Sequence, residues 1–220
     1  MRWDSMYEVI SFDLDGTLVS MDFVNSVWLE KIPEIYAENH QISIEKAKKY
    51  VMDEYMKVGP EAIEWYDIHY WIKKFKLDVE WKDLLMSCSN RLKLYPEVRE
   101  VLERLSKKGN LIIISNAAHE FIEVEISMLS LSPYFKRIFS AVSDFGRTKK
   151  DSWIYRRVMD EMDVDGKSAI HVGDNYEFDY LAALDSGMSA YYLDRRGKIE
   201  GNHVVHNLKE FEEKLMDEIK

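Results

Sequence analysis

Two aspartates stand two residues apart at the end of a short apolar run. Asp13 and Asp15 follow the segment Val9–Phe12, and Gly16 comes directly after them. Because side chains i and i+2 of an extended chain point the same way, both carboxylates can enter one crevice as the chain turns. Two carboxylates about 4 Å apart repel by roughly 4 kcal/mol at an effective dielectric of 20. That cost indicates a bound divalent cation, or an acid that stays protonated to do chemistry.

Three further predicted strands are also followed by polar residues. These are Ser115 and Asn116 after the strand over 111–114, Lys149 and Lys150 after the strand over 138–142, and Asp174 after the strand over 169–172. In a parallel sheet, ligands bind beyond the carboxyl ends of the strands, so these residues can share one site. Carboxylates, a hydroxyl and a lysine together suit phosphoryl transfer. Mg²⁺ is the expected metal because it prefers carboxylates, phosphate oxygens and water.

Predicted helices and strands alternate from residue 96 onwards. A further strand is predicted over 190–193, and helices are predicted over 96–108, 118–130, 152–163, 176–186 and 207–219. This alternation is typical of a parallel sheet that is covered by helices on both faces. The predicted fold class is therefore α/β, with a doubly wound, Rossmann-like parallel sheet.

Residues 21–94 have a different pattern. They contain no strand-like apolar run, they are rich in aromatic residues, and their apolar positions recur at helical spacing. Helices are predicted over 22–39, 43–57, 60–75 and 80–93. The chain is therefore expected to form a core domain of residues 1–20 and 95–220, with residues 21–94 as a helical cap domain.

Charge and composition restrict the partners. A net charge of −10 argues against nucleic acid or an anionic membrane surface, because both require a broad basic face. The single cysteine, Cys88, excludes an internal disulfide and fits a reducing compartment. No signal peptide or membrane span is recognised, so a cytoplasmic protein is expected, as a monomer or small homo-oligomer.

The motifs, taken in order, resemble those of the haloacid dehalogenase superfamily, and within it the phosphatases similar to phosphoglycolate phosphatase. The matching segments are Asp13–Thr17, Ile112–Asn116, Gly146–Asp151, and Gly173-Asp174 with Asp179. Residues 21–94 lie between the first two motifs, where that family inserts its mobile cap. The resemblance covers nearly the whole chain.

The resemblance implies a Mg²⁺-dependent phosphatase that hydrolyses a small phosphorylated metabolite through an aspartyl-phosphate. Asp13 would be the nucleophile. Asp15 would protonate the leaving oxygen and later deprotonate the attacking water, which requires a raised pKa. Asp15 also argues against dehalogenation, since true dehalogenases resemble this pattern but lack the second aspartate.

The resemblance also implies the groups that bind metal and phosphate. Mg²⁺ would be held by the Asp13 carboxylate, the Asp15 backbone carbonyl and Asp174. The phosphate would be bound by Ser115, Asn116 and Lys149, with Asp179 in support of the metal waters or of the lysine. Lys150 stands where the family usually has proline, so the choice of lysine stays open, with Lys149 preferred by its place in the motif.

Two other functions use the same fold. A phosphomutase or phosphotransferase would use Asp13 identically, and a regulatory or binding member would keep the fold without turnover. His171 lies in a predicted buried strand and is expected to be a packing residue.

Overall fold

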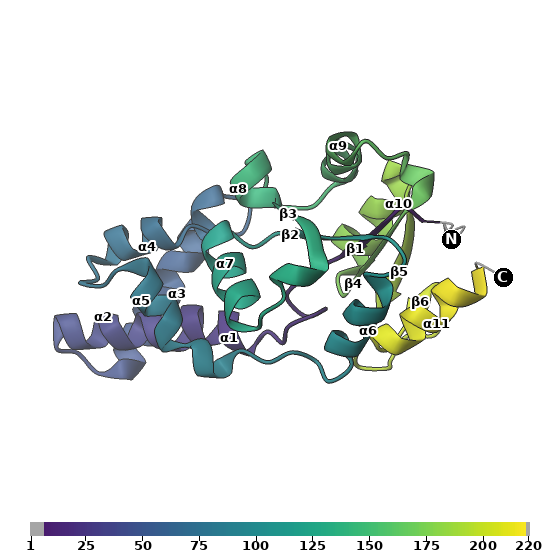
Figure 1. Cartoon of the computed structure of the whole chain (residues 1–220). Coiled ribbons are helices and arrows are strands. Elements are labelled where there is room, and N and C mark those ends of the chain that lie inside the picture. Colours follow the sequence, from purple (N-terminus) through teal and green to yellow (C-terminus); the bar gives the residue numbers. More distant parts are fainter. Residues whose placement is uncertain (1–6, 219–220) are drawn as a thin grey trace.

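A six-stranded parallel sheet forms the centre of the larger part of the computed structural model, which describes residues 7–218 (Figure 1). The strands are β1 (Val9–Phe12), β2 (Asn110–Ser115), β3 (Phe135–Ser140), β4 (Ala169–Gly173), β5 (Ser189–Leu193) and β6 (Val204–Val205). Their order in the sheet is β3-β2-β1-β4-β5-β6, and every neighbouring pair is parallel. The strand order reverses at β1, so ligands are expected beyond the carboxyl ends of β1 and its neighbours.

Helices cover both faces of the sheet. On one face lie α6 (Val98–Leu105), α7 (His119–Met128) and α11 (Leu208–Glu218), and on the other lie α9 (Ser152–Met162) and α10 (Ala182–Ser186). Alternate residues of a strand point to opposite faces of the sheet. In β1, Ile10 and Phe12 pack on the face covered by α6, α7 and α11, and Val9 packs on the face covered by α9 and α10. The predicted α/β class with a doubly wound parallel sheet is confirmed.

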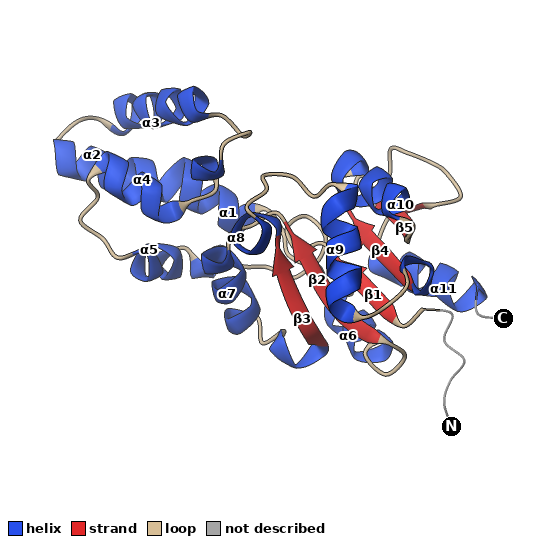
Figure 2. Cartoon of the chain, turned by 90° about the horizontal axis from the view of Figure 1, so that it is seen from above, coloured by secondary structure: helices blue, strands red, loops and turns tan. Residues whose placement is uncertain are grey.

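Residues 22–91 form a separate group of helices beside the sheet, which we call the helical lobe (Figure 2). It contains α1 (Asp22–Asn25), the π-helix η1 (Ser26–Lys31), α2 (Ile32–His40), α3 (Ile44–Val58), the 3₁₀ turn η2 (Ile63–Trp65), α4 (Ile68–Phe75), α5 (Trp81–Ser87) and the 3₁₀ turn η3 (Ser89–Arg91). The lobe has its own apolar core, which Phe121 and Val124 of α7 join from the sheet side. Helix α7 therefore connects the packing of the lobe to that of the sheet.

Several element boundaries differ from the sequence prediction for local reasons. The strand expected over 138–142 is β3, which ends at Ser140, because the Ser140 hydroxyl accepts a hydrogen bond from the Ser143 amide and starts α8 (Ala141–Phe145). The helix expected over 60–75 is broken, because Asp67 caps a new helix by accepting from the amides of His69 and Tyr70. Strand β6 was not predicted because it has only two residues.

Residues 1–6 of the predicted core domain and residue 219 of the predicted closing helix lie outside the described residues. Within the described range, none of the helices combines the length and the apolar character that a membrane crossing needs.

Candidate active site

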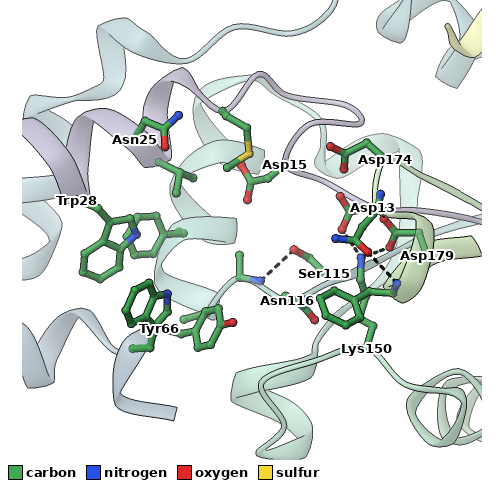
Figure 3. Close-up of a pocket in the computed structure, with 18 of the residues that line it drawn as sticks. Asp13, Asp15, Asn25, Trp28, Tyr66, Ser115, Asn116, Lys150, Asp174 and Asp179 are labelled. Carbon is green, nitrogen blue, oxygen red and sulfur yellow. Dashed lines mark hydrogen bonds and ion pairs between the residues drawn. The ribbon is translucent and has the colours of Figure 1, made fainter. Parts of the chain in front are cut away.

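A cavity of about 460 Å³ lies between the carboxyl edge of the sheet and the helical lobe (Figure 3). Of the residues named from the sequence, it is lined by Asp13, Asp15, Ser115, Asn116, Lys150, Asp174 and Asp179. Asp13, Asp15 and Asp174 follow β1 or β4, Ser115 and Asn116 lie at the end of β2, Lys150 belongs to the loop between α8 and α9, and Asp179 lies in η6 (Tyr176–Leu181). The parallel topology thus brings together side chains that are far apart along the chain.

Asp13 and Lys150 form a buried ion pair in this cavity. The Lys150 ammonium contacts both the Asp13 and the Asp179 carboxylates and donates to the Ile114 carbonyl oxygen at 3.2 Å. Burial raises the pKa of Asp13, and the Lys150 ammonium opposes that rise. Burial lowers the pKa of Lys150, but Asp13 and Asp179 more than offset it, so this pKa lies above its ordinary value. Lys150 is therefore a permanent cation beside Asp13.

Asp179 is held from several sides. It lies in the π-helix η6 (Tyr176–Leu181), its Oδ2 accepts from the Asn175 amide at 2.8 Å, and its Oδ1 lies 3.3 Å from His171 Nε2. Burial raises the pKa of Asp179, but Lys150 and His171 lower it below its ordinary range. The other ring nitrogen of His171 bonds the Ser11 hydroxyl. A buried chain of contacts thus runs from Ser11 through His171 and Asp179 to Lys150.

The sequence analysis missed that His171 takes part in this series of buried contacts. His171 is fully buried in β4, burial lowers its pKa, and its two ring nitrogens contact Asp179 and the Ser11 hydroxyl. A histidine within an otherwise apolar buried strand is a sequence signal for a hydrogen-bonded group, because a buried polar ring needs partners. Its neighbours in the fold could not be read from the sequence.

Asp15 lies on the turn that follows β1. The turn is closed by hydrogen bonds from the Leu18 amide to the Leu14 carbonyl at 2.8 Å and from the Gly16 amide to the Val19 carbonyl at 2.7 Å. The buried Oδ1 of Asp15 has no hydrogen-bond partner among the described residues. Burial, and then the charge of Asp174, raise the pKa of Asp15 to about 7, against the effect of Lys150. Near neutral pH, a substantial fraction of this carboxyl group carries a proton.

The carboxylates provide an oxygen-rich site that fits a divalent cation. One carboxylate oxygen each from Asp13, Asp174 and Asp179 lies within 4.8 Å of the others. Burial, and then Asp179, raise the pKa of Asp174 to about 6, although this residue is exposed at the mouth of the cavity. Three carboxylates face one ammonium here, so a further positive charge is needed for balance. Carboxylate oxygens are ligands that Mg²⁺ prefers.

Gly16 leaves room for Asp174. Gly16 has a φ of +83°, and a Cβ at this position would lie 2.3 Å from Asp174 Oδ2. A side chain would therefore be strained by the backbone conformation and would displace the carboxylate.

We predict that Gly16→Ala raises the Mg²⁺ concentration needed for half-maximal activity by about 10-fold or more, the usual effect of disturbing groups that orient a metal ligand. A Mg²⁺ titration of activity measures this shift. Gly146→Ala is the matched control, because Gly146 also has positive φ but a Cβ there meets no atom within 4 Å. An equal shift in both variants would show that backbone strain, rather than displacement of Asp174, is responsible.

Ser115 and Asn116 lie where β2 ends, beside the carboxylates. The buried Ser115 hydroxyl accepts from the Ala117 amide at 3.1 Å, and its own proton remains available to a ligand. Asn116 Oδ1 is buried and has no hydrogen-bond partner among the described residues. Both side chains line the cavity.

The preference for Lys149 over Lys150 is wrong in this structure. The Lys149 side chain is 41% exposed and pairs with Glu61 of the lobe at 2.7 Å, whereas that of Lys150 is 2% exposed and lies against Asp13. The two neighbouring lysines have different partners, and only Lys150 lines the cavity. The side chain of Asp151 then caps α9 by accepting from the Ile154 amide at 3.1 Å, which anchors the loop in this register.

A further buried acid near the site, Glu125, was not anticipated. Glu125 of α7 is fully buried, and neither carboxylate oxygen has a hydrogen-bond partner among the described residues. Burial, followed by the charges of Asp15 and Asp13, raises the pKa of Glu125 well above its ordinary value. The sequence pattern of α7 does not show whether a glutamate at this position is buried or exposed, so Glu125 could not be identified from the sequence.

The comparisons with known proteins agree with this arrangement. A family model described as haloacid dehalogenase-like hydrolase matches residues 7–187. The chain belongs to this family. The match includes the helical lobe and all the cavity residues named above.

Relatives of this haloacid dehalogenase-like hydrolase have different named activities. The GMP/IMP nucleotidase YrfG of Escherichia coli is 22% identical over 176 residues, which cover 80% of this chain and 77% of the relative. The (S)-2-haloacid dehalogenase 4A of Burkholderia cepacia is 29% identical over 117 residues, which cover 53% of this chain and 50% of the relative.

Solved structures share the fold. A HAD phosphatase from Thermococcus onnurineus superposes with a TM-score of 0.81 at 23% identity, covering 94% of this chain and 97% of that one. A 2-haloacid dehalogenase from Pseudomonas syringae superposes with a TM-score of 0.67 at 22% identity, covering 96% of this chain and 99% of that one.

Proposed function

We propose that this hydrolase is a Mg²⁺-dependent phosphatase that acts on a small phosphorylated metabolite through an aspartyl-phosphate. The observation that carries the proposal is that Asp13, Asp15 and Lys150 share one cavity with Ser115 and Asp174. This set combines a carboxylate nucleophile, an acid with a raised pKa, a buried cation and a hydroxyl. Phosphoryl transfer needs each of these groups, in positions that are organised before the substrate arrives.

Asp13 and Asp15 would divide the reaction into two steps. In the first, an Asp13 carboxylate oxygen forms a bond to phosphorus while the bond from phosphorus to the ester oxygen breaks, and Asp15 gives its proton to that oxygen. In the second, Asp15 takes a proton from water, the water oxygen bonds to phosphorus, and Asp13 is released as a carboxylate. The proton on Asp15 is thereby restored.

The remaining residues would hold the phosphate and the metal. Lys150 replaces Lys149 as the proposed phosphate-binding lysine, and Ser115 and Asn116 complete the anion site. Mg²⁺ would be held by the Asp13 carboxylate, the Asp15 backbone carbonyl and Asp174. When bound, it would neutralise negative charge between the carboxylates and the phosphate. Asp179 would position Lys150, because it contacts the ammonium directly and is itself held by His171.

We propose that the helical lobe is the cap, with residues 21–94 as the cap domain and residues 1–20 and 95–220 as the core domain. The proposed reacting residues come from the sheet side, and the opposite wall of the cavity comes from the lobe (Figure 3). Closure of the lobe over the sheet edge would exclude water during the first step and add contacts to the substrate.

Asp15 favours a phosphatase over a dehalogenase, although the comparisons include both. A halide leaves without a proton, whereas an alkoxide that leaves phosphorus needs one, and Asp15 is the group placed to supply it. The nucleotidase activity named for the Escherichia coli relative makes nucleoside monophosphates the first substrates to test.

We expect Asp15→Asn to slow hydrolysis of alkyl phosphates by about 100-fold or more, and that of p-nitrophenyl phosphate much less. General acid catalysis contributes roughly 10²–10⁴-fold, and a nitrophenolate leaves without needing the proton. The kcat values of Asp15→Asn and wild type on ribose 5-phosphate and p-nitrophenyl phosphate measure this contrast. An equal loss on both esters would remove Asp15 as the general acid.

The same assignment predicts a pH dependence. The protonated fraction of Asp15 falls as the pH rises above its pKa of about 7. The wild-type kcat/KM for ribose 5-phosphate should therefore decrease with increasing pH in this range. The decrease should be absent in Asp15→Asn, which has no proton to lose.

A simple assay tests the proposed function. The purified chain should release inorganic phosphate from p-nitrophenyl phosphate and from a panel of phosphorylated metabolites when Mg²⁺ is present, and EDTA should stop the release. Transfer of the phosphoryl group to an added sugar phosphate in preference to water would indicate a phosphomutase. Chloride release from 2-chloropropionate would indicate a dehalogenase, and no turnover of any compound would indicate a regulatory member.

A further inference from the structure

The end of the cavity away from the carboxylates is lined by aromatic side chains. They are Trp28, Tyr55, Trp65 and Tyr66 of the lobe, and Phe121 of the sheet side. Figure 3 shows Trp28 and Tyr66 at this end, with Asp13, Lys150, Asp174 and Asp179 at the other. Trp28 stacks on Phe121, with ring centroids 5.2 Å apart and planes 23° apart. These rings make up much of the cavity lining, which also includes the aliphatic side chains of Met21, Val24 and Leu29.

The aromatic end carries no positive charge. Among the described residues that line the cavity, the one cation is Lys150, and both Asp13 and Asp179 already contact it. Lys149 does not line the cavity, although its ammonium lies 5.7 Å from the centroid of the Phe178 ring, and it pairs with Glu61. Arg195 pairs with Glu97 at 2.8 Å and does not line the cavity. A substrate with a second anionic group would thus have to bury that charge without a partner, which is costly.

Polar groups are also sparse at this end. The Asn25 amide lies beside Trp28 (Figure 3), and the Tyr66 hydroxyl donates weakly to the Pro60 carbonyl at 3.4 Å. A sugar without a base would bring several hydroxyl groups here and would leave most of them without hydrogen-bond partners. A planar heteroaromatic ring would instead lie flat on the aromatic wall, and an amide at its edge could pair with it.

We propose that the substrate is a phosphate monoester whose organic group is uncharged and carries a planar aromatic ring, as in a nucleoside 5′-monophosphate. This inference rests on the proposed phosphatase function and deepens it. The phosphate lies at Asp13 and Lys150, and the ring lies among Trp28, Tyr66 and Phe121. Phosphoglycolate and sugar bisphosphates are excluded, because each brings a second anion to a region without a cation.

A matched pair of substrates tests the ring directly. GMP and ribose 5-phosphate both carry the phosphate on the primary 5′-oxygen of a ribose, so the bond that breaks is the same, and they differ in the base. Stacking of one base on an aromatic side chain strengthens binding by roughly 10-fold or more. We therefore expect kcat/KM for GMP to exceed that for ribose 5-phosphate by at least about 10-fold. Phosphoglycolate should be the poorest of the three.

Two variants locate the effect. Trp28→Leu should reduce the ratio of kcat/KM for GMP to that for ribose 5-phosphate by about 10-fold. Tyr66→Leu provides a second variant, should the first disturb the lobe. Trp81→Leu is the matched control, because Trp81 also packs against the lobe core but does not line the cavity, and its ratio should equal that of the wild type. Circular dichroism melting shows whether each variant is folded.

Binding distinguishes a nucleotide from a simple aryl ester. The Kd values of GMP, phenyl phosphate and ribose 5-phosphate for an Asp13→Asn variant are measured by calorimetry with Mg²⁺. Tighter binding of GMP than of phenyl phosphate assigns a nucleoside monophosphate, and equal binding assigns an aryl ester. Either result supports a substrate that carries an aromatic ring. If ribose 5-phosphate binds as tightly as GMP and phenyl phosphate, the proposal of an aromatic substrate is wrong.

The two proposals fail in different ways. If the chain hydrolyses ribose 5-phosphate, GMP and phosphoglycolate with similar kcat/KM, the aromatic substrate class is wrong and the phosphatase function stands. If it prefers phosphoglycolate, the argument from missing cations is wrong as well. If no phosphate monoester is hydrolysed with Mg²⁺, the phosphatase function and the inference that rests on it both fail.

Discussion

Replacing Asp13 by Asn should reduce kcat on every phosphate monoester by about 10⁴-fold or more, because loss of a covalent nucleophile removes the whole two-step pathway. The amide has nearly the shape of the carboxylate but cannot form a bond to phosphorus at a useful rate. Steady-state phosphate release measures the loss. Wild-type protein should also incorporate ³²P from a labelled substrate into a base-labile acyl phosphate, and the variant should incorporate none.

The fold should survive the Asp13→Asn change. Lys150 keeps its contact with Asp179, so its charge is not left without a partner. An unchanged melting curve, together with lost activity, would assign the defect to chemistry. Retention of full activity in a correctly folded variant would instead exclude Asp13 as the nucleophile and with it the proposed mechanism.

Replacing Lys150 by Met should reduce kcat/KM by about 10²–10³-fold, the usual cost of removing one group that stabilises charge in the transition state. Lys150 lies against Asp13, and the incoming phosphate has no other lysine or arginine among the described cavity residues. Without this cation, repulsion between the phosphate and the carboxylates is less well balanced. Kinetics on p-nitrophenyl phosphate and on GMP measure the loss.

Lys149→Met is the matched control for Lys150→Met. Both variants remove one lysine from the same loop, but Lys149 is exposed and pairs with Glu61, so its loss should change kcat/KM by less than about 3-fold, because exposed ion pairs contribute little. Lys150→Met leaves Asp13 and Asp179 without their partner and should destabilise the fold by about 3–5 kcal/mol. Lys150→Arg keeps the positive charge, so it tests whether the activity lost in Lys150→Met is caused by the missing charge or by unfolding. A larger loss in Lys149→Met than in Lys150→Met would reverse the assignment.

Most of the architecture could be predicted because it depends on local patterns. Apolar runs such as Leu111–Ile114 are too short for a helix of the core and too apolar for an exposed strand, which identifies them as strands of a buried parallel sheet. The predictions were less accurate at residues 135–145 and 60–75. At these places a single capping side chain, Ser140 or Asp67, starts a new helix and overrides the apolar pattern.

The candidate site was predicted only in part, for a physical reason. The sequence by itself determined which polar residues lie at the strand ends, because each apolar run ends at or just before them. The parallel topology then places Asp13, Ser115 and Asp174 at one edge of the sheet. Only the tertiary structure decided which of two adjacent lysines enters the cavity, and that His171 holds Asp179. Only the tertiary structure also showed that the aromatic residues of the lobe form an uncharged wall opposite the carboxylates. These features depend on side-chain direction and on tertiary contacts, such as that of Lys150 with Asp13, 137 residues away, which local sequence patterns do not encode.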